Sequence, residues 1–460
     1  MNIKAKIYHF WNNPDGRTQK VNRNISYSLI IKGFGILNPA LVGSLFITVI
    51  FSSLTGGYLN PYEYGIWITL NSILTWINYF DIGLGNGLRN KLTEALAIKD
   101  YNMAQMYVST ALVLLFFIAL ILYALFLILS SFISWYDILN VESSIRNLDT
   151  IVMIVMFCMC ICFVLRIIGT IFLSYQNTWV NDFLTFAGSL LAFVWIYILT
   201  CTSEGSLMKV AIAFSLSPVI VYLIAFPITF FKFHKEIRPC IKAVKLKYAN
   251  SLVGLGIQFF ALQLSCLMIY ATSNFIISKL FSPAEVTPYN IAFKYCNLIV
   301  MGFSIIISPL WSAITDAYVR KDIKWIILNM NKMIKIWGLC CLALLLMVLV
   351  SQPIFHLWIG YEVLISYSLC FSLAIYSSIY MWCILFCAYS NGTGALKIQM
   401  LTMSVGAILF IPVAIFVAKH IGLVGIAYSM GTVLLIPGIA LAIEYKYSIR
   451  KLKNIYSVNS

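Results

Sequence analysis

The chain has 460 residues, of which 61% are hydrophobic and only 10% are charged, and its mean hydropathy is +0.91. This composition excludes a water-soluble globular fold, because too few polar side chains remain to cover a surface in water. The net charge is +15, and nearly all of the twelve cysteines lie within apolar runs. We therefore expect structural, buried cysteines and not a disulfide framework.

From the N-terminus, a polar tail of 24 residues shows no signal-peptide pattern, and charge-free runs then follow along the chain. A helix needs roughly 20 residues to cross a ~30 Å hydrocarbon layer. Strands of a membrane β-barrel would alternate in polarity, and no such alternation is present. We therefore predict an all-α membrane protein of about twelve spans: 25–51, 62–82, 105–134, 148–173, 179–200, 208–231, 250–280, 286–314, 331–358, 364–390, 396–418 and 421–445.

An even number of spans places both termini on one side of the membrane. The tails and loops on that side carry 23 Lys and Arg residues, and those on the opposite side carry four. By the positive-inside rule, we expect both termini to lie in the cytoplasm. The expected partner of this basic surface is anionic membrane lipid. A nucleic acid is not expected, because the basic residues of 232–247 are spread through a short linker.

The chain also matches itself without gaps when its first half is laid on its second. At a shift of 222 residues, the matched positions are Pro61, Glu63, Thr93, Glu94, Ala95, Lys99 and Asp100, which fall on Pro283, Glu285, Thr315, Asp316, Ala317, Lys321 and Asp322. At a shift of 221 residues, Gly33, Gly35 and Ile36 fall on Gly254, Gly256 and Ile257. Spans 1 and 2 thus correspond to spans 7 and 8.

Corresponding spans are six apart. Because six is an even number of membrane crossings, corresponding helices run in the same direction and the two halves have the same orientation. We predict two six-helix bundles related by a pseudo-twofold axis along the membrane normal. Bundles that rock against each other around a central cavity are a direct route to alternating access. The predicted parts are an N-terminal tail at 1–24, an N-terminal lobe at 25–231, a linker at 232–249, a C-terminal lobe at 250–445 and a C-terminal tail at 446–460.

The segments 64–70 (YGIWITL) and 80–92 (FDIGLGNGLRNKL) resemble polysaccharide-biosynthesis flippases of the Wzx type. These belong to the multidrug/oligosaccharidyl-lipid/polysaccharide (MOP) exporter superfamily. The resemblance implies a MATE-like fold and a location in the bacterial inner membrane. It further implies a transporter that flips undecaprenyl-pyrophosphate-linked oligosaccharide from the cytoplasmic to the outer leaflet, for O-antigen, capsule or exopolysaccharide. It also implies an ion gradient of H⁺ or Na⁺ as the driving force, other polysaccharide-assembly proteins as partners, and no cofactor.

A charged pyrophosphate head group needs a shielded route, and cations within the membrane would provide one. Intramembrane cations are costly and usually face a cavity, although those near an interface can extend their charge to the surface. We expect Lys294 to line the substrate cavity, because it lies about 12 Å inside its predicted span. Lys32, which is flanked by glycines, and Arg166 are further candidates. For Arg166, extension to the cytoplasmic surface is the competing interpretation.

A carboxylate that changes its protonation state commonly couples transport to an ion. Asp182 is positioned to meet Arg166 on the neighbouring span, and Asp81 could pair with Arg89 at the end of span 2. These residues are candidates for an ion pair or for coupling, and a purely structural ion pair is the alternative for Asp182. The sequence leaves the coupling ion undetermined.

Pro39 lies in the middle of span 1, where its ring and missing N–H group kink a helix. With Gly33 and Gly35 it forms a candidate hinge, and static packing is the alternative. In the register that places Gly33 on Gly254, the counterpart of Pro39 is Phe260. The hinge is therefore expected in one half only.

Two other classes of function are open. An ion-coupled multidrug or metabolite exporter would share the fold, but a cationic drug favours acidic residues in the cavity, and here cations predominate. A membrane acyltransferase or polysaccharide polymerase would need catalytic groups at membrane depth, and the four histidines lie in tails, loops or span ends. We therefore expect no enzyme. No metal site is expected either, because Cys158 and Cys162 share one helix face and Cys160 points away.

Overall fold

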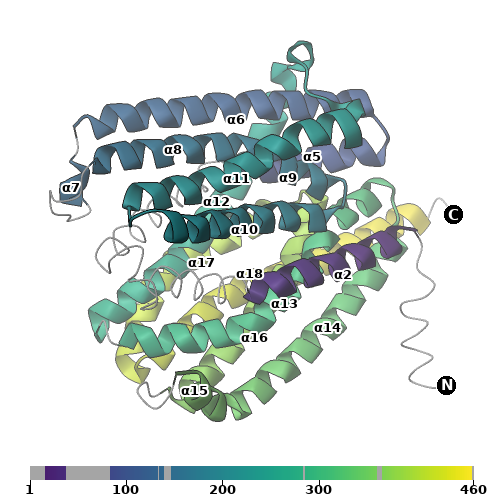
Figure 1. The fold of residues 1–460 in the computed structure, drawn as a ribbon. Coiled ribbons are helices and arrows are strands. Elements are labelled where there is room, and N and C mark those ends of the chain that lie inside the picture. Colours follow the sequence, from purple (N-terminus) through teal and green to yellow (C-terminus); the bar gives the residue numbers. More distant parts are fainter. Residues whose placement is uncertain are drawn as a thin grey trace. The chain divides into compact units, whose positions relative to one another are not determined.

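A computed structural model describes residues 16–37, 83–132, 134–138, 147–282, 285–359 and 365–457, and helix is the only regular structure within these ranges (Figure 1). Ten of the described helices are long and apolar enough to cross a membrane. The two remaining predicted spans, 25–51 and 62–82, lie partly or wholly outside the described residues. The prediction of an all-α membrane protein is confirmed.

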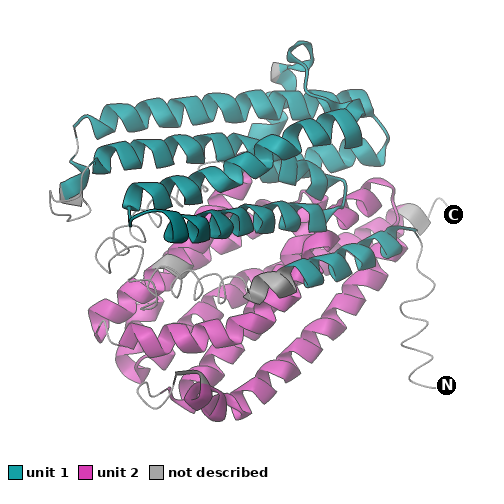
Figure 2. Cartoon of the chain, viewed as in Figure 1, with its two compact units in different colours: residues 1–256 teal, residues 257–460 magenta. Residues whose placement is uncertain are grey.

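The chain divides into two compact units, residues 1–256 and residues 257–460 (Figure 2). The helix α12 (Leu246–Leu280) crosses this division. Unit 1 also contains α2 (Gly16–Leu37), α5 (Leu84–Ala97), α6 (Tyr101–Ser130), α7 (Trp135–Ile138), α8 (Leu148–Leu165), α9 (Ile167–Ser174), α10 (Thr178–Thr202), α11 (Leu207–Ile228) and the short turns η3 (Thr229–Phe233), η4 (Lys235–Ile237) and η5 (Ile241–Ala243).

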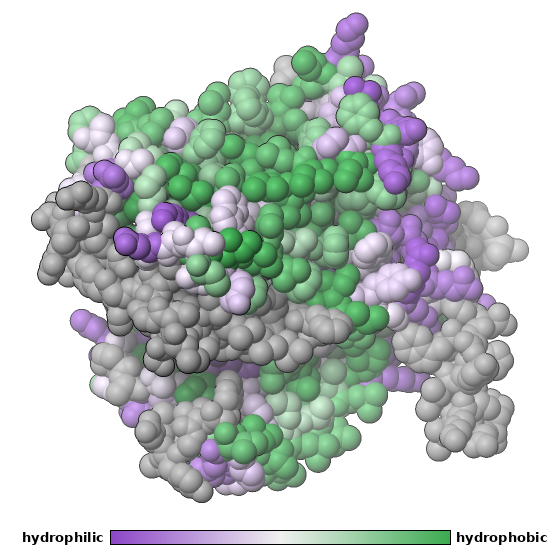
Figure 3. All heavy atoms as spheres, viewed as in Figure 1, coloured by the Kyte–Doolittle hydropathy of each residue, from purple (hydrophilic) through white to green (hydrophobic). Residues whose placement is uncertain are grey.

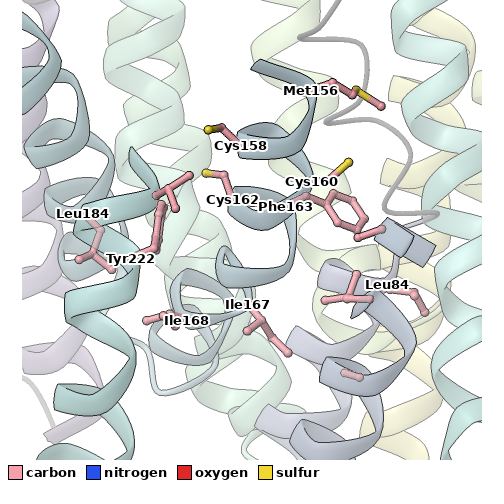
Figure 4. Close-up of a cluster of buried hydrophobic side chains, with 14 of the residues drawn as sticks. Leu84, Met156, Cys158, Cys160, Cys162, Phe163, Ile167, Ile168, Leu184 and Tyr222 are labelled. Carbon is pink, nitrogen blue, oxygen red and sulfur yellow. The ribbon is translucent and has the colours of Figure 1, made fainter. Parts of the chain in front are cut away.

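Within unit 1, α8 packs against α6 and α11, and α9 packs against α5 and α10. Cys158 and Cys162 lie on the side of α8 that faces Tyr222 and Leu184, whereas Cys160 lies on the other side (Figure 4). This is the arrangement that the helical period predicts. All three cysteines are buried and free, and they fill the core between helices.

The helix α6 lies at the surface of unit 1. The most apolar part of α6 is only 11% buried, compared with 56% for the continuous span formed by α8 and α9. On the visible face, hydrophobic residues cover the middle of these helices, and hydrophilic ones gather at the end where α6 begins (Figure 3). Such a surface is stable when lipid surrounds its apolar part.

Unit 2 contains the rest of α12 together with α13 (Val286–Val319), α14 (Ile323–Leu349), α15 (Ser351–Ile359), α16 (Tyr367–Thr393), α17 (Lys397–Ile421) and α18 (Val424–Ser457). The helix α16 is central: it packs against α13, α14 and α18, and 61% of its most apolar window is buried. The helix α17 packs against α18, and α14 is largely exposed. Unit 2 is therefore built around α13, α16 and α18.

The two turns that the sequence repeat links have the same backbone geometry. Lys99, after α5, has φ 60°, and Lys321, after α13, has φ 62°. The next residue caps the following helix in both cases: the carboxylate of Asp100 accepts from the N–H of the residue three positions on, and Asp322 does the same.

The hydrogen bonds that close these turns also correspond. The N–H groups of Asp100 and Asp322 donate to carbonyl oxygens five residues back, at 3.0 Å and 2.9 Å. Such bonds, with a left-handed residue after the helix, form a C-terminal helix cap. The internal repeat is therefore structural at this turn as well as visible in the sequence.

Two predicted boundaries are wrong. The predicted span 331–358 is broken at Val350, because Pro353 cannot donate a hydrogen bond into the preceding helix and is tolerated only in the first turn of the new helix α15. The segment after the second predicted span is a helix, α5, and not a loop. Its leucines Leu84, Leu88 and Leu92 recur every four residues and are buried.

Candidate functional site

One face of the membrane helix α13 is polar along most of its length. Its side chains lie three, four or seven residues apart, so they project on the same side of the helix. They are Thr287, Asn290, Lys294, Asn297, Ser304 and Ser308. We call these six residues the polar stripe.

The polar stripe lies on a face of α13 that is only partly covered. Thr287 and Lys294 are exposed and the other four members are half-buried. The opposite face of α13 is apolar and packed: Ala292 and Phe303 are buried, and the thiol of Cys296 lies 3.9 Å from the carbonyl oxygen of Cys370 on α16. Because polar groups are costly in hydrocarbon, a stripe of this kind favours contact with water over contact with lipid tails.

Lys294 is the only charged member of the polar stripe. It lies eight residues after the start of α13, which is about 12 Å along the helix axis. Among the residues that the structure describes, no carboxylate lies within ion-pair distance of its ammonium group. The side chain of Lys294 is exposed, so an anionic group that approaches this face of α13 can reach its charge.

An asparagine pair joins the polar stripe to α12. The side-chain nitrogen of Asn290 donates to the side-chain oxygen of Asn274 at 3.1 Å and to the carbonyl oxygen of Val286 at 2.8 Å. Asn274 is exposed, and Asn290 lies one turn before Lys294. Two amides and an ammonium group thus lie on adjacent turns, a combination that can bind phosphate oxygens and sugar hydroxyls.

Aromatic rings lie beside the polar stripe and continue from α13 to α16. Phe293 stacks on Tyr289 with ring centroids 6.2 Å apart, and on Tyr376 with centroids 6.0 Å apart. Tyr376 in turn stacks on Tyr380 at 5.9 Å. Phe293 and Tyr380 are half-buried, so an aromatic edge borders the polar stripe.

A second cluster of predicted residues lies in unit 1. Arg166 is the residue at which α8 ends and α9 begins, and its charge acts on the thiol of Cys162, one turn earlier. Both Arg166 and Asp182 act electrostatically on the hydroxyl group of Tyr222 on α11. The structure thus brings Arg166 and Asp182 to the same tyrosine.

Arg89 lies elsewhere, on α5, and only 5% of it is exposed. Its carbonyl oxygen accepts hydrogen bonds from Thr93 at 2.7 Å and from Ser174 at 3.2 Å. The sequence predicts Arg89 at the end of span 2, and the structure instead buries it within the separate helix α5. Asp81, its predicted partner, lies outside the described residues.

The predicted hinge is only partly covered by the structure. Gly33, Gly35 and Lys32 lie in the last two turns of α2, and Pro39 lies outside the described residues. Within the described part of the chain, no group of three or more His, Cys, Asp or Glu residues could hold a metal ion.

Sequence reasoning found Lys294 and missed its neighbours. It selected charged residues, and Asn274, Asn290, Asn297 and Ser304 are neutral. The signal was nevertheless present, because the polar residues of 287–308 recur at helical spacing within an otherwise apolar span.

Comparison with solved structures defines the class of fold. An outward-facing multidrug resistance MATE transporter of the MOP superfamily matches with a TM-score of 0.75 at 13% identity, covering 96% of this chain and 100% of that one. The MATE transporter of Vibrio cholerae in its bent form matches with a TM-score of 0.75 at 15% identity, covering 95% and 99%. The chain is therefore a multi-pass membrane protein with the two-lobe fold of the MATE transporters.

Comparison by sequence gives more particular relatives. The chain is 22% identical over 406 residues to a Salmonella typhimurium protein named as an O-antigen transporter, covering 83% of this chain and 87% of the relative. It is 23% identical over 269 residues to a Yersinia pseudotuberculosis protein named as an O-antigen export protein, covering 55% and 58%. No family model matches. Fold and relatives together support a transporter of the MOP superfamily.

Proposed function

We propose that this protein flips undecaprenyl-pyrophosphate-linked oligosaccharide from the cytoplasmic to the outer leaflet of a bacterial inner membrane. Its product would serve the synthesis of a surface polysaccharide. The observation that supports this most is Lys294 on the polar stripe: an available cation, two amides and an aromatic edge together match an anionic phosphate joined to sugars. The names of its relatives by sequence point the same way.

The direction of transport follows from the proposed orientation. Both termini lie in the cytoplasm, as the distribution of Lys and Arg indicates, so substrate enters from the basic side. The polyprenyl chain can remain in lipid throughout, and only the head group needs a polar route. Lys32 and Arg166 are proposed as further contacts for the head group.

Coupling and movement are proposed for other residues. Asp182 with Arg166, and Asp81 with Arg89, are candidates to respond to H⁺ or Na⁺. Pro39 with Gly33 and Gly35 is proposed as the hinge of the first span. Other polysaccharide-assembly proteins are the proposed partners that supply and receive the substrate.

The deciding experiment is genetic. The gene is deleted, and lipid-linked repeat units are extracted and assayed for the leaflet that they occupy. We expect the units to accumulate on the cytoplasmic leaflet and the surface polysaccharide to be lost, with both effects reversed by the intact gene. Normal export of the polysaccharide in the deletion strain would contradict the proposal.

The second candidate is an ion-coupled multidrug or metabolite exporter, which the MATE fold of the chain favours. The same deletion strain separates the two functions. An exporter predicts greater sensitivity to cationic drugs with unchanged surface polysaccharide, whereas a flippase predicts the reverse.

A further inference from the structure

The linker between the two predicted lobes is fixed to α6. The N–H of Cys240 donates to the hydroxyl of Ser109 at 3.1 Å, and the N–H of Lys245 donates to the hydroxyl of Thr110 at 3.3 Å. Both hydroxyl groups lie within the first three turns of α6, whose 30 residues extend about 45 Å. A helix of that length spans the hydrocarbon layer plus both head-group layers. The side-chain nitrogen of Gln105, about 6 Å along α6, donates to the carbonyl oxygen of Arg238 at 2.6 Å, which places Arg238 at head-group depth in a helix that is centred in the bilayer.

Three large apolar side chains of this region point away from the protein. Phe231 is 55% exposed, Phe233 is 58% exposed and Ile241 is 89% exposed. The linker itself is well anchored, because Ile237 is fully buried. The outward apolar side chains are therefore presented by a fixed backbone, and they favour an apolar medium over water.

Cations alternate with these apolar side chains. They are Lys232, Lys235, Arg238 and Lys242, all exposed. The guanidinium of Arg238 lies 4.3 Å from the centre of the Phe231 ring, and the ammonium of Lys232 lies 5.9 Å from that of Phe233. Within the described part of the chain, none of the four forms an ion pair.

The one acidic residue of the linker is already engaged, because Glu236 accepts a hydrogen bond from the hydroxyl of Tyr175 at 2.8 Å. We call Phe231, Phe233, Ile241 and the four cations the linker patch. It belongs to a teal loop that projects beyond α6 at the end where hydrophilic side chains gather (Figures 1 and 3).

We propose that the linker patch is a binding site for the head groups of anionic phospholipids. Its apolar side chains enter the boundary between head groups and acyl chains, and its cations contact the phosphate groups. Each cation near an anionic membrane surface contributes about 1 kcal/mol, a factor of roughly five in binding. The site goes beyond transport and does not depend on which substrate the protein carries.

A native cysteine allows a direct test. Cys240 is exposed within the linker, and Cys201 is the other exposed cysteine, so Cys201→Ser leaves Cys240 as the preferred thiol for a fluorescent label. The full-length protein is reconstituted in phosphatidylcholine vesicles that contain phosphatidylglycerol, with one or the other lipid brominated as a quencher. We expect brominated phosphatidylglycerol to quench the label more strongly than an equal amount of brominated phosphatidylcholine.

Two charge variants make the test specific. The first carries Lys232→Gln, Lys235→Gln, Arg238→Gln and Lys242→Gln. The second is a matched control with the same loss of charge on exposed residues of α18: Lys446→Gln, Arg450→Gln, Lys451→Gln and Lys453→Gln. We expect the preference for phosphatidylglycerol to fall at least about fivefold in the first variant and to stay unchanged in the second.

Equal quenching by the two brominated lipids would overturn the proposal, and so would an unchanged preference for phosphatidylglycerol in the first variant. Equal losses of that preference in both variants would also overturn it, because they would reflect net charge alone. Thermal melting of both variants confirms that they are folded. The assay measures lipid contact and not transport. The lipid-binding proposal can therefore be wrong while the flippase function is right, and the flippase function can be wrong while the lipid-binding proposal is right.

Discussion

At the scale of single residues, Lys294 has a charge within an apolar helix and no carboxylate to neutralise it in the described part of the chain. Holding an exposed ammonium group at this depth is costly unless water or an anionic ligand reaches it. A charge that no described carboxylate neutralises can attract a ligand that carries the opposite charge. The asparagine pair beside it then provides orientation as well as attraction.

The first prediction concerns this charge. Lys294→Ala should lower transport of the lipid-linked oligosaccharide by roughly 10- to 100-fold, because a hydrogen bond to a charged group contributes about 1.5–3 kcal/mol. Lys294→Arg should keep most of the activity. The measurement is surface polysaccharide in the deletion strain carrying each variant. Lys279→Ala, which removes an exposed lysine at the end of α12, is the matched control, and normal transport by Lys294→Ala would exclude the role.

The second prediction concerns His234, which follows the last turn of η3 and is 8% exposed. Its ring stacks on Tyr175 with centroids 3.8 Å apart. Burial lowers the pKa of His234, Glu236 at 3.7 Å opposes this shift, and the charge of Lys20 adds to it. The folded protein therefore favours the neutral imidazole.

A lowered pKa has a definite sign for stability. His234 contributes fully to the free energy of unfolding when the pH is above its pKa in the unfolded chain, which is about 6.5. This contribution is lost as the pH falls through the lower pKa that His234 has in the folded state. His234→Phe keeps a stacking ring but cannot be protonated. Its Tm in detergent should therefore fall less between about pH 7.5 and about pH 5 than that of the parent protein. An equal fall in both proteins would show that other groups dominate the acid response.

At the scale of elements, the polar stripe predicts which surface of a membrane helix faces water. Thr287→Cys, Asn297→Cys and Ser304→Cys should react with a charged, membrane-impermeant thiol reagent. The matched control is Leu120→Cys on α6: its side chain is 53% exposed but lies on a helix that faces lipid, so it should stay unreactive. Reaction rates are compared with the parent protein. Equal rates at Ser304→Cys and Leu120→Cys would mean that the stripe faces lipid.

A second prediction at this scale tests a close helix contact. A Cβ atom on Gly87 of α5 would lie 2.9 Å from the carbonyl oxygen of Leu252 on α12, and 3.4 Å from the nitrogen of Gly256. Because both neighbours are backbone atoms, Gly87→Ala must push the helices apart. The free energy of unfolding should fall by roughly 1–3 kcal/mol, as overpacking generally costs.

The matched control for this contact is on α12 itself. A Cβ atom on Gly254 would meet nothing within 4 Å, so Gly254→Ala should be neutral or stabilising, because alanine favours helix over glycine. The two variants are compared by thermal unfolding in the same detergent. A Tm for Gly87→Ala at or above that of the parent protein would contradict the contact.

The helix α5 also shows why the sequence predicted some elements and missed others. Long apolar runs such as α6 were predicted because length and hydropathy are enough to identify a membrane span. The glycines of 83–87 and the charges that follow favoured a loop. The structure places Lys91 and Glu94 in an ion pair of 2.7 Å on one side of a helix whose leucines are buried. The leucines of this segment do recur at helical spacing, but the charged residues between them made the segment look like a loop.

The candidate site was predicted only in part for a related reason. Lys294 was found because a charge inside a span is conspicuous. The hydrogen bond between Asn290 and Asn274, one turn before Lys294, depends on how two helices pack, and no spacing within one helix encodes that register. The aromatic edge likewise depends on helix packing, because the stacking of Phe293 on Tyr376 joins α13 to α16.

At the scale of the whole molecule, the repeat preserves the scaffold and not the site. The turns after α5 and α13 match in backbone angle, capping carboxylate and hydrogen bonds. The polar stripe repeats only in part. At the shift of 222 residues, Lys294, Asn297 and Ser308 correspond to the polar residues Ser72, Thr75 and Asn86, whereas Asn290 and Ser304 correspond to Ile68 and Ile82. The cation and the amide of Asn290 therefore occur in one half only.

This asymmetry gives the last prediction. The double variant Lys294→Ser with Ser72→Lys keeps the net charge and moves the cation to the equivalent position in the other half. If transport required only a cation in either half, the exchange would restore it. We expect no restoration, because the amides of Asn274 and Asn290 that accompany the ammonium group stay behind. Surface polysaccharide in the deletion strain is again the measurement, with Ser72→Lys alone as the control for damage at that position. Full activity of the double variant would show that the two halves are interchangeable and that the polar stripe does not define the site.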